Sequence, residues 1–389
     1  MPAMSPSPDP VKAWLAALMR GAEPGPMPDE AMLLDTAGAE GVLALCHDRL
    51  RRSPAWEQYP ATLRAALTRD AYQEVVVELV RVEELREVLE ALARQGLSVL
   101  LLKGAALAYT LYPEPYLRSR SDTDLLLPSR EDAERAWRVL QNSGYQRSHI
   151  ELGDLIHYEL GCYKISHGGL IHTLDLHWQL SNTALFTERF TFTELAAAAI
   201  PIPTLGLHAY GLDPVHALLL ACMHRITNMW LGTADRLIWI YDIHLLVQHL
   251  TNEQWQQIIM LAEERMLCGP CLNGFNSAQS LLATVLPDDI QRRLRTGATQ
   301  EGFDPRQTDT WWRFEWLALC TLPSTIMRLR RLGQYLFPSV EHMRHRYGFH
   351  NLLWLPWFYS LRIVQRATKA IGSCRQTDET PRRGWRKIH

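Results

Sequence analysis

The stretch that decides the fold is Leu97-Ser98-Val99-Leu100-Leu101-Leu102-Lys103-Gly104-Ala105-Ala106. The run from Leu97 to Leu102 is too short for a helix and almost wholly apolar, which predicts a central strand covered on both faces. The residues from Lys103 to Ala106 then predict a turn into a helix. There, Gly104 lets the backbone approach a ligand closely, and the free N–H groups of the first turn offer sites for phosphate oxygens. Most α/β proteins share such a junction, so residues further along the chain decide its meaning.

A second strand is predicted from Asp122 to Leu127, and it begins with the pattern Asp122-Thr123-Asp124. Because residues two apart share a face of a strand, the carboxylates of Asp122 and Asp124 project side by side. Two adjacent carboxylates at the edge of a core repel each other and lose solvation, and a divalent cation such as Mg²⁺ relieves both costs. Pro128 ends the strand, and a capping-box pattern opens a helix over 129–142.

A β-hairpin is predicted next, with strands at 158–165 and 170–179 joined by a glycine turn. Its second strand holds Asp175 between two leucines, although Asp is depleted in strands and costly to bury alone. A neighbouring arginine or backbone amide is one way to satisfy this carboxylate. Two metal ions shared by Asp122, Asp124 and Asp175 are another. Such ions would clamp a triphosphate and lower the pKa of an attacking hydroxyl, with Asp175 best placed to help deprotonate it.

Several segments are similar to the uncharacterised bacterial nucleotidyltransferase family of the polymerase-β superfamily. The resemblance spans roughly residues 30 to 365 and rests on Leu101-Leu102-Lys103-Gly104, Tyr112-Pro113, Arg118, Asp122-x-Asp124-Leu125-Leu126, Gly144-Tyr145, Asp175-Leu176-His177-Trp178, Leu218 to His224 and Trp239 to Ile243. It implies an α+β (mixed α/β) fold with a polymerase-β-like nucleotidyltransferase core and dependence on two Mg²⁺ ions. It also implies an NTP donor and transfer of a nucleotidyl group to an acceptor hydroxyl. The acceptor, whether a small molecule, a protein or RNA, is not identified by the resemblance.

The expected site has two sets of residues. The nucleotide-binding set is Lys103, Gly104, Ala105, Arg118 and Arg120, and the catalytic and metal-binding set is Asp122, Asp124 and Asp175. Relatives carry serine after the glycine, where this chain has Ala105, so no hydroxyl is available there to the β- or γ-phosphate. This departure leaves open a catalytically weakened protein that binds nucleotide or a partner. Lys103 is either a phosphate contact or a strand-end lysine that reaches solvent. One of the two arginines is expected to pair with the acidic cluster or the phosphates.

Helical patterns flank this core on both sides. The expected domains are an N-terminal helical region at 1–96, the nucleotidyltransferase core at 97–205, a C-terminal helical domain at 206–371, and a basic, disordered tail at 372–389. In the first region, Asp9-Pro10 predicts a helix start, 29–52 reads as helical, and Gly96 predicts a C-cap. In the third, Asp213-Pro214 predicts another start and Thr251 a capping box.

Composition indicates a globular protein without a strong electrostatic bias. The 389 residues are 47% hydrophobic and 21% charged, with a net charge of −2, which gives no overall attraction to nucleic acid or an anionic membrane. The seven cysteines are scattered, as in a reduced intracellular protein, and residues 1–8 lack the pattern of a signal peptide. Because no apolar run is long enough to cross a bilayer, we expect a cytoplasmic protein without stable membrane insertion.

Three further patterns have competing interpretations. Cys268-Gly269-Pro270-Cys271 matches a redox tetrapeptide, but it is expected to end a helix rather than open one, and no second ligand pair accompanies it for zinc. His224, Arg225 and Asp242 either face a cleft or form hydrogen bonds between helices. The basic segment around 328–346 reads as a membrane or RNA surface, or as solvated helix faces. A toxin–antitoxin component that modifies a protein or tRNA remains a further functional alternative.

Overall fold

The computed structural model describes residues 9–148, 153–166, 168–181, 183–302, 304, 310–349 and 351–374. The chain forms two compact units. Unit 1 comprises residues 1–149 and 158–318, and unit 2 comprises residues 150–157 and 319–389. The expected basic tail beyond residue 374 lies outside the described residues. Within the described part, no helix combines the length and the apolarity needed to span a membrane.

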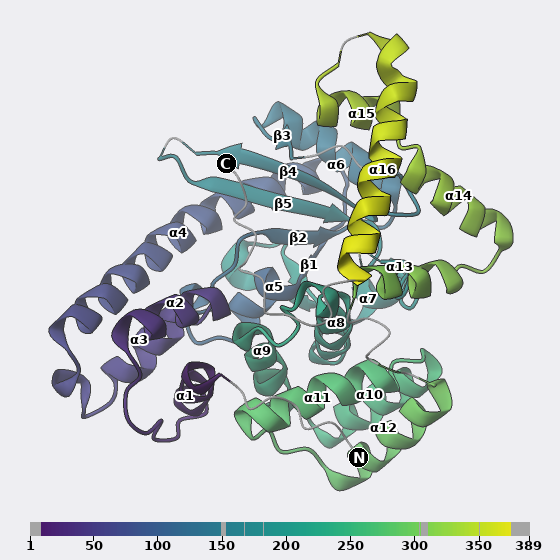
Figure 1. The fold of residues 1–389 in the computed structure, drawn as a ribbon. Helices are drawn as coiled ribbons and strands as arrows, with labels where there is room; N and C mark the ends of the chain where they lie inside the picture. Colours follow the sequence, from purple (N-terminus) through teal and green to yellow (C-terminus); the bar gives the residue numbers. More distant parts are fainter. Residues whose placement is uncertain are drawn as a thin grey trace. The chain divides into compact units, whose positions relative to one another are not determined.

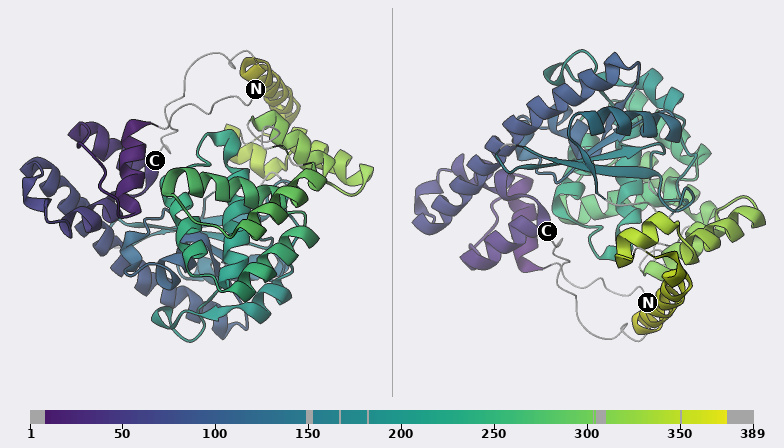
Figure 2. Two further views of the ribbon diagram at one scale, coloured as in Figure 1. Left: turned by 90° about the horizontal axis from the view of Figure 1, so that it is seen from below. Right: turned by 90° about the horizontal axis from the view of Figure 1, so that it is seen from above.

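Unit 1 begins with four helices and one 3₁₀ turn: α1 (Pro10–Met19), α2 (Glu30–Glu40), α3 (Leu43–Arg51), η1 (Trp56–Gln58) and α4 (Ala61–Arg94). The predicted start at Asp9-Pro10 is confirmed, because the Asp9 side chain accepts a hydrogen bond from the backbone of Val11. The prediction of one helical stretch over 29–52 is corrected. Gly41 adopts φ +73° and separates α2 from α3, a left-handed conformation that ends a helix. The long helix α4 runs from α3 to the sheet (Figures 1 and 2).

A seven-stranded mixed sheet follows, in the order β3-β4-β5-β2-β1-β7-β6. Its strands are β1 (Leu100–Leu102), β2 (Thr123–Leu126), β3 (Gln146–Arg147), β4 (Glu159–Ile165), β5 (Ile171–His177), β6 (Ile200–Pro201) and β7 (Tyr210–Gly211). Strands β1 and β2 are antiparallel, whereas β2 and β5 are parallel. The predicted strands and hairpin are thus present, although β1 and β2 are shorter than expected. The sheet also extends past residue 205, where the core was expected to end.

Alternation along the strands divides the sheet into two buried faces. Leu101, Leu125 and Leu174 belong to a cluster with the inner side of α4 and with α6 (Arg130–Asn142). Leu100 and Leu126 belong to a larger cluster that includes the helices after the sheet. In Figure 1 these later helices lie on the opposite side of the sheet from α6. Both faces of β1 and β2 are therefore covered, as the apolar runs predicted.

The connecting elements of unit 1 are α5 (Lys103–Thr110), η2 (Pro115–Leu117), α7 (Phe192–Ala198) and η3 (Pro203–Leu205). The later helices are α8 (Pro214–Thr227), η4 (Met229–Leu231), α9 (Leu237–Gln248), α10 (Asn252–Glu264), α11 (Cys268–Leu282), α12 (Asp288–Glu301) and α13 (Trp311–Cys320). The predicted cap at Asp213 and capping box at Thr251 are confirmed by side-chain hydrogen bonds to Val215 and Gln254.

The prediction that Cys268-Gly269-Pro270-Cys271 ends a helix is wrong, because these residues open α11. The carboxylate of Glu301 accepts hydrogen bonds from the backbone N–H groups of Cys268 and Gly269, at 2.8 and 2.9 Å. Burial and then the Glu301 charge raise the pKa of the Cys268 thiol to about 12. Contact with Cys222 and burial also raise the pKa of Cys271. A redox cysteine needs a lowered thiol pKa, so the environment is opposite to the one required.

Unit 2 contains α14 (Thr325–Leu336), α15 (Val340–Tyr347), η6 (Leu352–Trp354) and α16 (Leu355–Cys374), together with the segment 153–157. Its interior is small and aromatic. Phe349 and Tyr347 both stack on Phe358 with ring centroids 4.9 Å apart, and Met343 is fully buried. An ion pair connects the 153–157 segment to α14: Asp154 Oδ2 lies 2.7 Å from Arg330 Nη2.

A buried ion pair joins the loop after α5 to α9. Arg118 donates to both carboxylate oxygens of Asp242, with Nε–Oδ1 at 2.8 Å and Nη2–Oδ2 at 2.6 Å. Tyr112 donates its hydroxyl to the same carboxylate at 2.7 Å, and the side chains of Arg118 and Asp242 are 6% and 5% exposed. Asp242 is therefore hydrogen-bonded, but its partners Tyr112 and Arg118 come from the segment after α5 rather than from another helix. A buried pair of this kind is stable only while both partners are present.

Replacing Asp242 with Ala should therefore lower the free energy of unfolding by about 3–5 kcal/mol, because Arg118 would be left buried without a counter-charge. The matched control is Glu263→Ala, which removes the half-exposed partner of Arg293. That exposed pair should contribute at most about 1 kcal/mol. Urea denaturation of both variants tests the prediction, and equal losses for the two would contradict it.

Candidate active site

A cavity of about 130 Å³ in unit 1 brings together the ends of β1 and β2 with α8 and α9. Its lining residues are Lys103, Gly104, Ala106, Leu107, Arg118, Ser119, Arg120, Ser121, Asp122, Asp124, Leu212, Ala217, Leu220, Ala221, His224, Arg236, Trp239 and Asp242. One wall comes from the predicted site segments, and the other from helices that follow the sheet. Six of the eight predicted site residues line this cavity, whereas Ala105 and Asp175 do not.

Asp124 and Asp175 are neighbours in the sheet. They are directly paired in the parallel ladder between β2 and β5, so their side chains leave the same face of adjacent strands. On the other side of β5, the residue opposite Asp175 is Gly161, which has no side chain to occupy that face. His177, two residues beyond Asp175, lies on the same face of β5. The pleat of the sheet thus places the carboxylates of Asp124 and Asp175 on one face of neighbouring strands.

Asp124 is buried, and one of its carboxylate oxygens contacts two side chains. Its Oδ1 is 2.6 Å from Lys103 Nζ and 2.8 Å from His177 Nε2. Burial alone raises a carboxyl pKa, but here Lys103 and His177 outweigh it and hold the pKa of Asp124 below its usual value. The same contacts raise the pKa of Lys103 and of His177 against the effect of their own burial. In this cluster Asp124 and Lys103 form an ion pair, and His177 contacts the same carboxylate oxygen.

Asp175 lies where negative charge is in excess. Burial, followed by the charges of Glu159 and Asp124, raises the pKa of Asp175 to about 7. His177 partly offsets this effect, and its Nδ1 is 3.4 Å from Glu159 Oε2. Asp175 is therefore surrounded by more negative than positive side chains.

The backbone at Lys103 is unusual for a residue with a side chain. Lys103 has φ +51°, in the left-handed region, at the point where β1 passes directly into α5. Such conformations are uncommon outside glycine and asparagine, and they cluster at functional sites. The ammonium group it carries lies on Asp124, which excludes the interpretation of a lysine extended into solvent.

Arg118 and Gly104 are in close contact. A Cβ atom at Gly104 would lie 3.2 Å from three guanidinium atoms of Arg118, closer than an ordinary van der Waals contact. Because Arg118 is held by Asp242, it cannot easily move away. The glycine is therefore needed for the packing of this arginine, a role that the sequence pattern did not predict.

Arg120 borders the cavity and is buried, and some of its guanidinium nitrogens have no hydrogen-bond acceptor. Its Nη2 donates to Glu78 at 2.9 Å and to the Tyr109 hydroxyl at 3.0 Å. Its side chain is 2% exposed, and within the described structure Nε and Nη1 have no hydrogen-bond partner. A buried guanidinium with unsatisfied donors is costly unless a ligand supplies acceptors.

The opposite wall is aromatic and was largely missed by sequence reasoning. His224 on α8 packs edge-on against Trp239 on α9, with ring centroids 4.6 Å apart, and Arg236 lies over the Trp239 ring at 5.8 Å. Burial and then the charge of Lys103 lower the pKa of His224 to about 3, so its imidazole is neutral. His224 thus faces the cavity, whereas its neighbour Arg225 is held between helices by Asp235 and Ser277.

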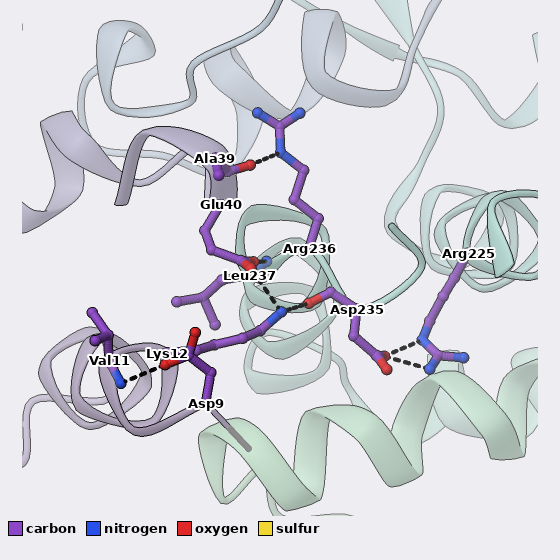
Figure 3. A network of polar contacts seen from close by, with 9 residues as sticks. All are labelled: Asp9, Val11, Lys12, Ala39, Glu40, Arg225, Asp235, Arg236 and Leu237. Carbon is purple, nitrogen blue, oxygen red and sulfur yellow. Dashed lines mark hydrogen bonds and ion pairs between the residues drawn. The ribbon is translucent and has the colours of Figure 1, made fainter. Parts of the chain in front are cut away.

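The N-terminal helices position this wall, as Figure 3 shows. Glu40 at the end of α2 accepts hydrogen bonds from Lys12 Nζ, at 2.9 Å, and from the backbone N–H of Leu237, at 2.5 Å. Arg236 donates Nε to the carbonyl of Ala39 at 2.9 Å. Residues some 200 positions apart in sequence thereby fix the start of α9.

Carboxylates are the donors that Mg²⁺ prefers, and the excess of negative charge around Asp175 fits a cation in this region. Asp122 lines the cavity, and no hydrogen bond or ion pair holds its carboxylate within the described part of the chain. Among those same residues, however, no three acidic, histidine or cysteine side chains are grouped as a metal site. Lys103 instead supplies the positive charge at Asp124. The chemistry of these donors suits a divalent cation, but the three predicted carboxylates, Asp122, Asp124 and Asp175, are not grouped around a common point among the described residues.

A mixed sheet with carboxylates on β2 and β5, a strand–helix junction at Lys103-Gly104 and flanking helices is the α+β nucleotidyltransferase fold. The chain belongs to a family described as uncharacterised nucleotidyltransferases, whose model matches residues 26–283. Membership implies nucleotidyl transfer from an NTP as the general activity. No curated protein matches the chain.

Adding a methyl group at Gly104 should disturb the wall that Arg118 forms. Gly104→Ala should lower the free energy of unfolding by about 1–3 kcal/mol, because overpacking against a fixed guanidinium forces a shift. The control is Gly38→Ala in α2, where a Cβ would make an ordinary contact at 3.5 Å. That change should be neutral or stabilise by about 0.5–1 kcal/mol. Thermal or urea unfolding compares the two, and a neutral result for both would refute the packing role.

Proposed function

We propose that this chain transfers a nucleotidyl group from an NTP to an acceptor hydroxyl, using two Mg²⁺ ions held by Asp122, Asp124 and Asp175. The observation that carries the proposal is the in-register pairing of Asp124 with Asp175 beside a cavity that Asp122 and Lys103 also border. Family membership supports the general reaction. The metal, the mechanism and the residue roles are proposed from the chemistry of the side chains.

The triphosphate would be bound by positive groups at one end of the cavity. The first turn of α5 presents free backbone N–H groups, which bind phosphate oxygens without a serine hydroxyl. Arg120 has two unsatisfied donors beside this turn, and Lys103 carries a full positive charge. Arg118 acts indirectly, because Asp242 already holds its guanidinium in place.

When bound, Mg²⁺ would neutralise charge that develops on the α-phosphate and lower the pKa of the attacking hydroxyl. In the reaction, the acceptor oxygen forms a bond to the α-phosphorus while the bond to the β-phosphate oxygen breaks, so pyrophosphate leaves. The proton of the acceptor hydroxyl is assigned to Asp175, next to Asp124 in the sheet. His224 and Trp239 form the apolar wall opposite, where a neutral imidazole can accept a hydrogen bond from an uncharged acceptor.

The six free cysteines among the described residues, five of them buried, are compatible with a reducing compartment. We therefore propose that the reaction takes place in the cytoplasm. The competing function is nucleotide binding without transfer, which is favoured by the contact of Lys103 with Asp124, because this lysine already neutralises a carboxylate that is proposed to bind metal. Metal binding and turnover separate the two functions.

Asp124→Asn should reduce Mg²⁺-dependent pyrophosphate release by at least about a hundredfold, because it removes a ligand charge from the reacting centre. The assay uses a panel of NTPs with cell extract as the source of acceptor and follows labelled nucleotide into products. The control is Asp35→Asn, an exposed carboxylate on α2 that should leave the rate unchanged. Equal activity in the intact protein and the Asp124 variant would reject the enzymatic role.

Metal binding is expected even without an acceptor. Titration of the intact protein with Mn²⁺, followed by calorimetry, should show binding that is at least about tenfold weaker in Asp175→Asn. Asp35→Asn again serves as the control. Binding that is unchanged in the Asp175 variant would remove this residue from the metal site, while leaving the role of Asp124 to the turnover assay.

A further inference from the structure

The charges of the chain are divided unevenly along the sequence. Residues 319–389 contain thirteen Lys and Arg against three Asp and Glu, a formal charge of +10. Residues 1–318 contain 27 Lys and Arg against 39 Asp and Glu, a formal charge of −12. The near-neutral total therefore conceals a strongly basic segment, and this segment forms most of unit 2.

Unit 2 also exposes large apolar side chains in quantity. They are Ile326, Leu329 and Leu332 of α14, Phe337 after it, Leu352, Leu353 and Trp354 of η6, and Trp357 of α16. We call these eight residues the apolar face. Leu353 is 84% exposed, Trp357 62% and Trp354 58%. In α14 the exposed residues recur every three positions, so they follow one side of the helix.

Most of the apolar face lies outside the interior of unit 2, although Phe337 also packs edge-on against Tyr359 with ring centroids 5.4 Å apart. That interior is formed by Met343 and Phe349 with the rings stacked on Phe358. Exposed apolar side chains in this number on a small folded unit favour a binding surface. The basic residues Arg344 and Arg346 of α15 are also exposed, so cationic and apolar groups are presented by the same small unit.

We propose that the apolar face and the basic residues of unit 2 form a docking surface for an anionic phospholipid bilayer. Exposed Trp and Leu side chains on short amphipathic helices enter the boundary between head groups and acyl chains, while arginines contact lipid phosphates. The charge of +10 complements an anionic leaflet. This mode is peripheral and does not need a membrane-spanning helix.

The aliphatic residues distinguish lipid from nucleic acid as the partner. Nucleic-acid surfaces combine basic groups with aromatic rings that stack on bases. Exposed Ile326, Leu329 and Leu353 have no counterpart in such contacts, whereas a bilayer accommodates them. The proposal does not depend on the nucleotidyl transfer proposed above.

Co-sedimentation of the full chain with vesicles tests the proposal. With phosphatidylcholine vesicles containing one third phosphatidylglycerol, the intact protein should pellet at low salt, with about tenfold weaker binding at high salt. Pure phosphatidylcholine vesicles should bind about tenfold more weakly at low salt. No binding to anionic vesicles at low salt would overturn the proposal.

Two variants separate the contributions of the surface. Leu353→Ser combined with Trp354→Ser should weaken vesicle binding about tenfold or more, and so should Arg344→Glu combined with Arg346→Glu. The matched control is Leu207→Ser, a 90% exposed leucine of unit 1, which should bind as the intact protein does. Circular dichroism confirms that each variant keeps its helices. Equal binding by all variants would contradict the assignment. Tight binding of a single-stranded oligonucleotide, lost in the Leu353 and Trp354 variant while vesicles remain unbound, would assign the surface to nucleic acid instead.

Discussion

The buried carboxylate of Asp124 is the constraint on which the rest of the site depends. An ionised group removed from water is stable only if opposite charge and hydrogen bonds replace its hydration. Lys103 and His177 provide both, at 2.6 and 2.8 Å from the same oxygen. Lys103 directly follows β1, and His177 is the last residue of β5. Their contacts with Asp124 of β2 therefore link the ends of three strands.

This constraint explains the local backbone. Lys103 can reach Asp124 only because β1 turns into α5 without an intervening loop, and the turn places Lys103 in the left-handed region. Gly104 then packs against Arg118, which Asp242 of α9 holds, and Tyr112 donates to the same Asp242 carboxylate. The strand wall and the helical wall of the cavity therefore meet at Gly104 and Arg118, and each contains a buried carboxylate paired with a cation from another element.

The two units differ in how their charged side chains are balanced. Unit 1 pairs its buried charges internally, as in the contacts of Arg118 with Asp242 and of Arg120 with Glu78. Unit 2 carries mainly positive charge and has few acidic residues to neutralise it. It also exposes tryptophans and leucines. The partner proposed for it, a surface that is both apolar and anionic, complements both features.

Much of this protein could be predicted from sequence where a pattern is local. Strand patterns correctly placed Asp124 and Asp175 on β2 and β5, although β2 begins at Thr123 and leaves Asp122 just before it. The caps at Asp9, Asp213 and Thr251 marked true helix starts. Local patterns failed where two segments meet. The partnership of Asp124 with Lys103, the burial of Ala105 away from the cavity, and the wall formed by His224 and Trp239 all depend on the packing of distant elements. The redox-like tetrapeptide at Cys268 is the converse case, because burial and then Glu301, 33 residues away, raise the pKa of its first thiol. Sequence alone therefore determined which strands carry the carboxylates, since alternation is a property of a single strand. Only the tertiary structure decided which groups neutralise them, because electrostatic partners are selected by distance in space.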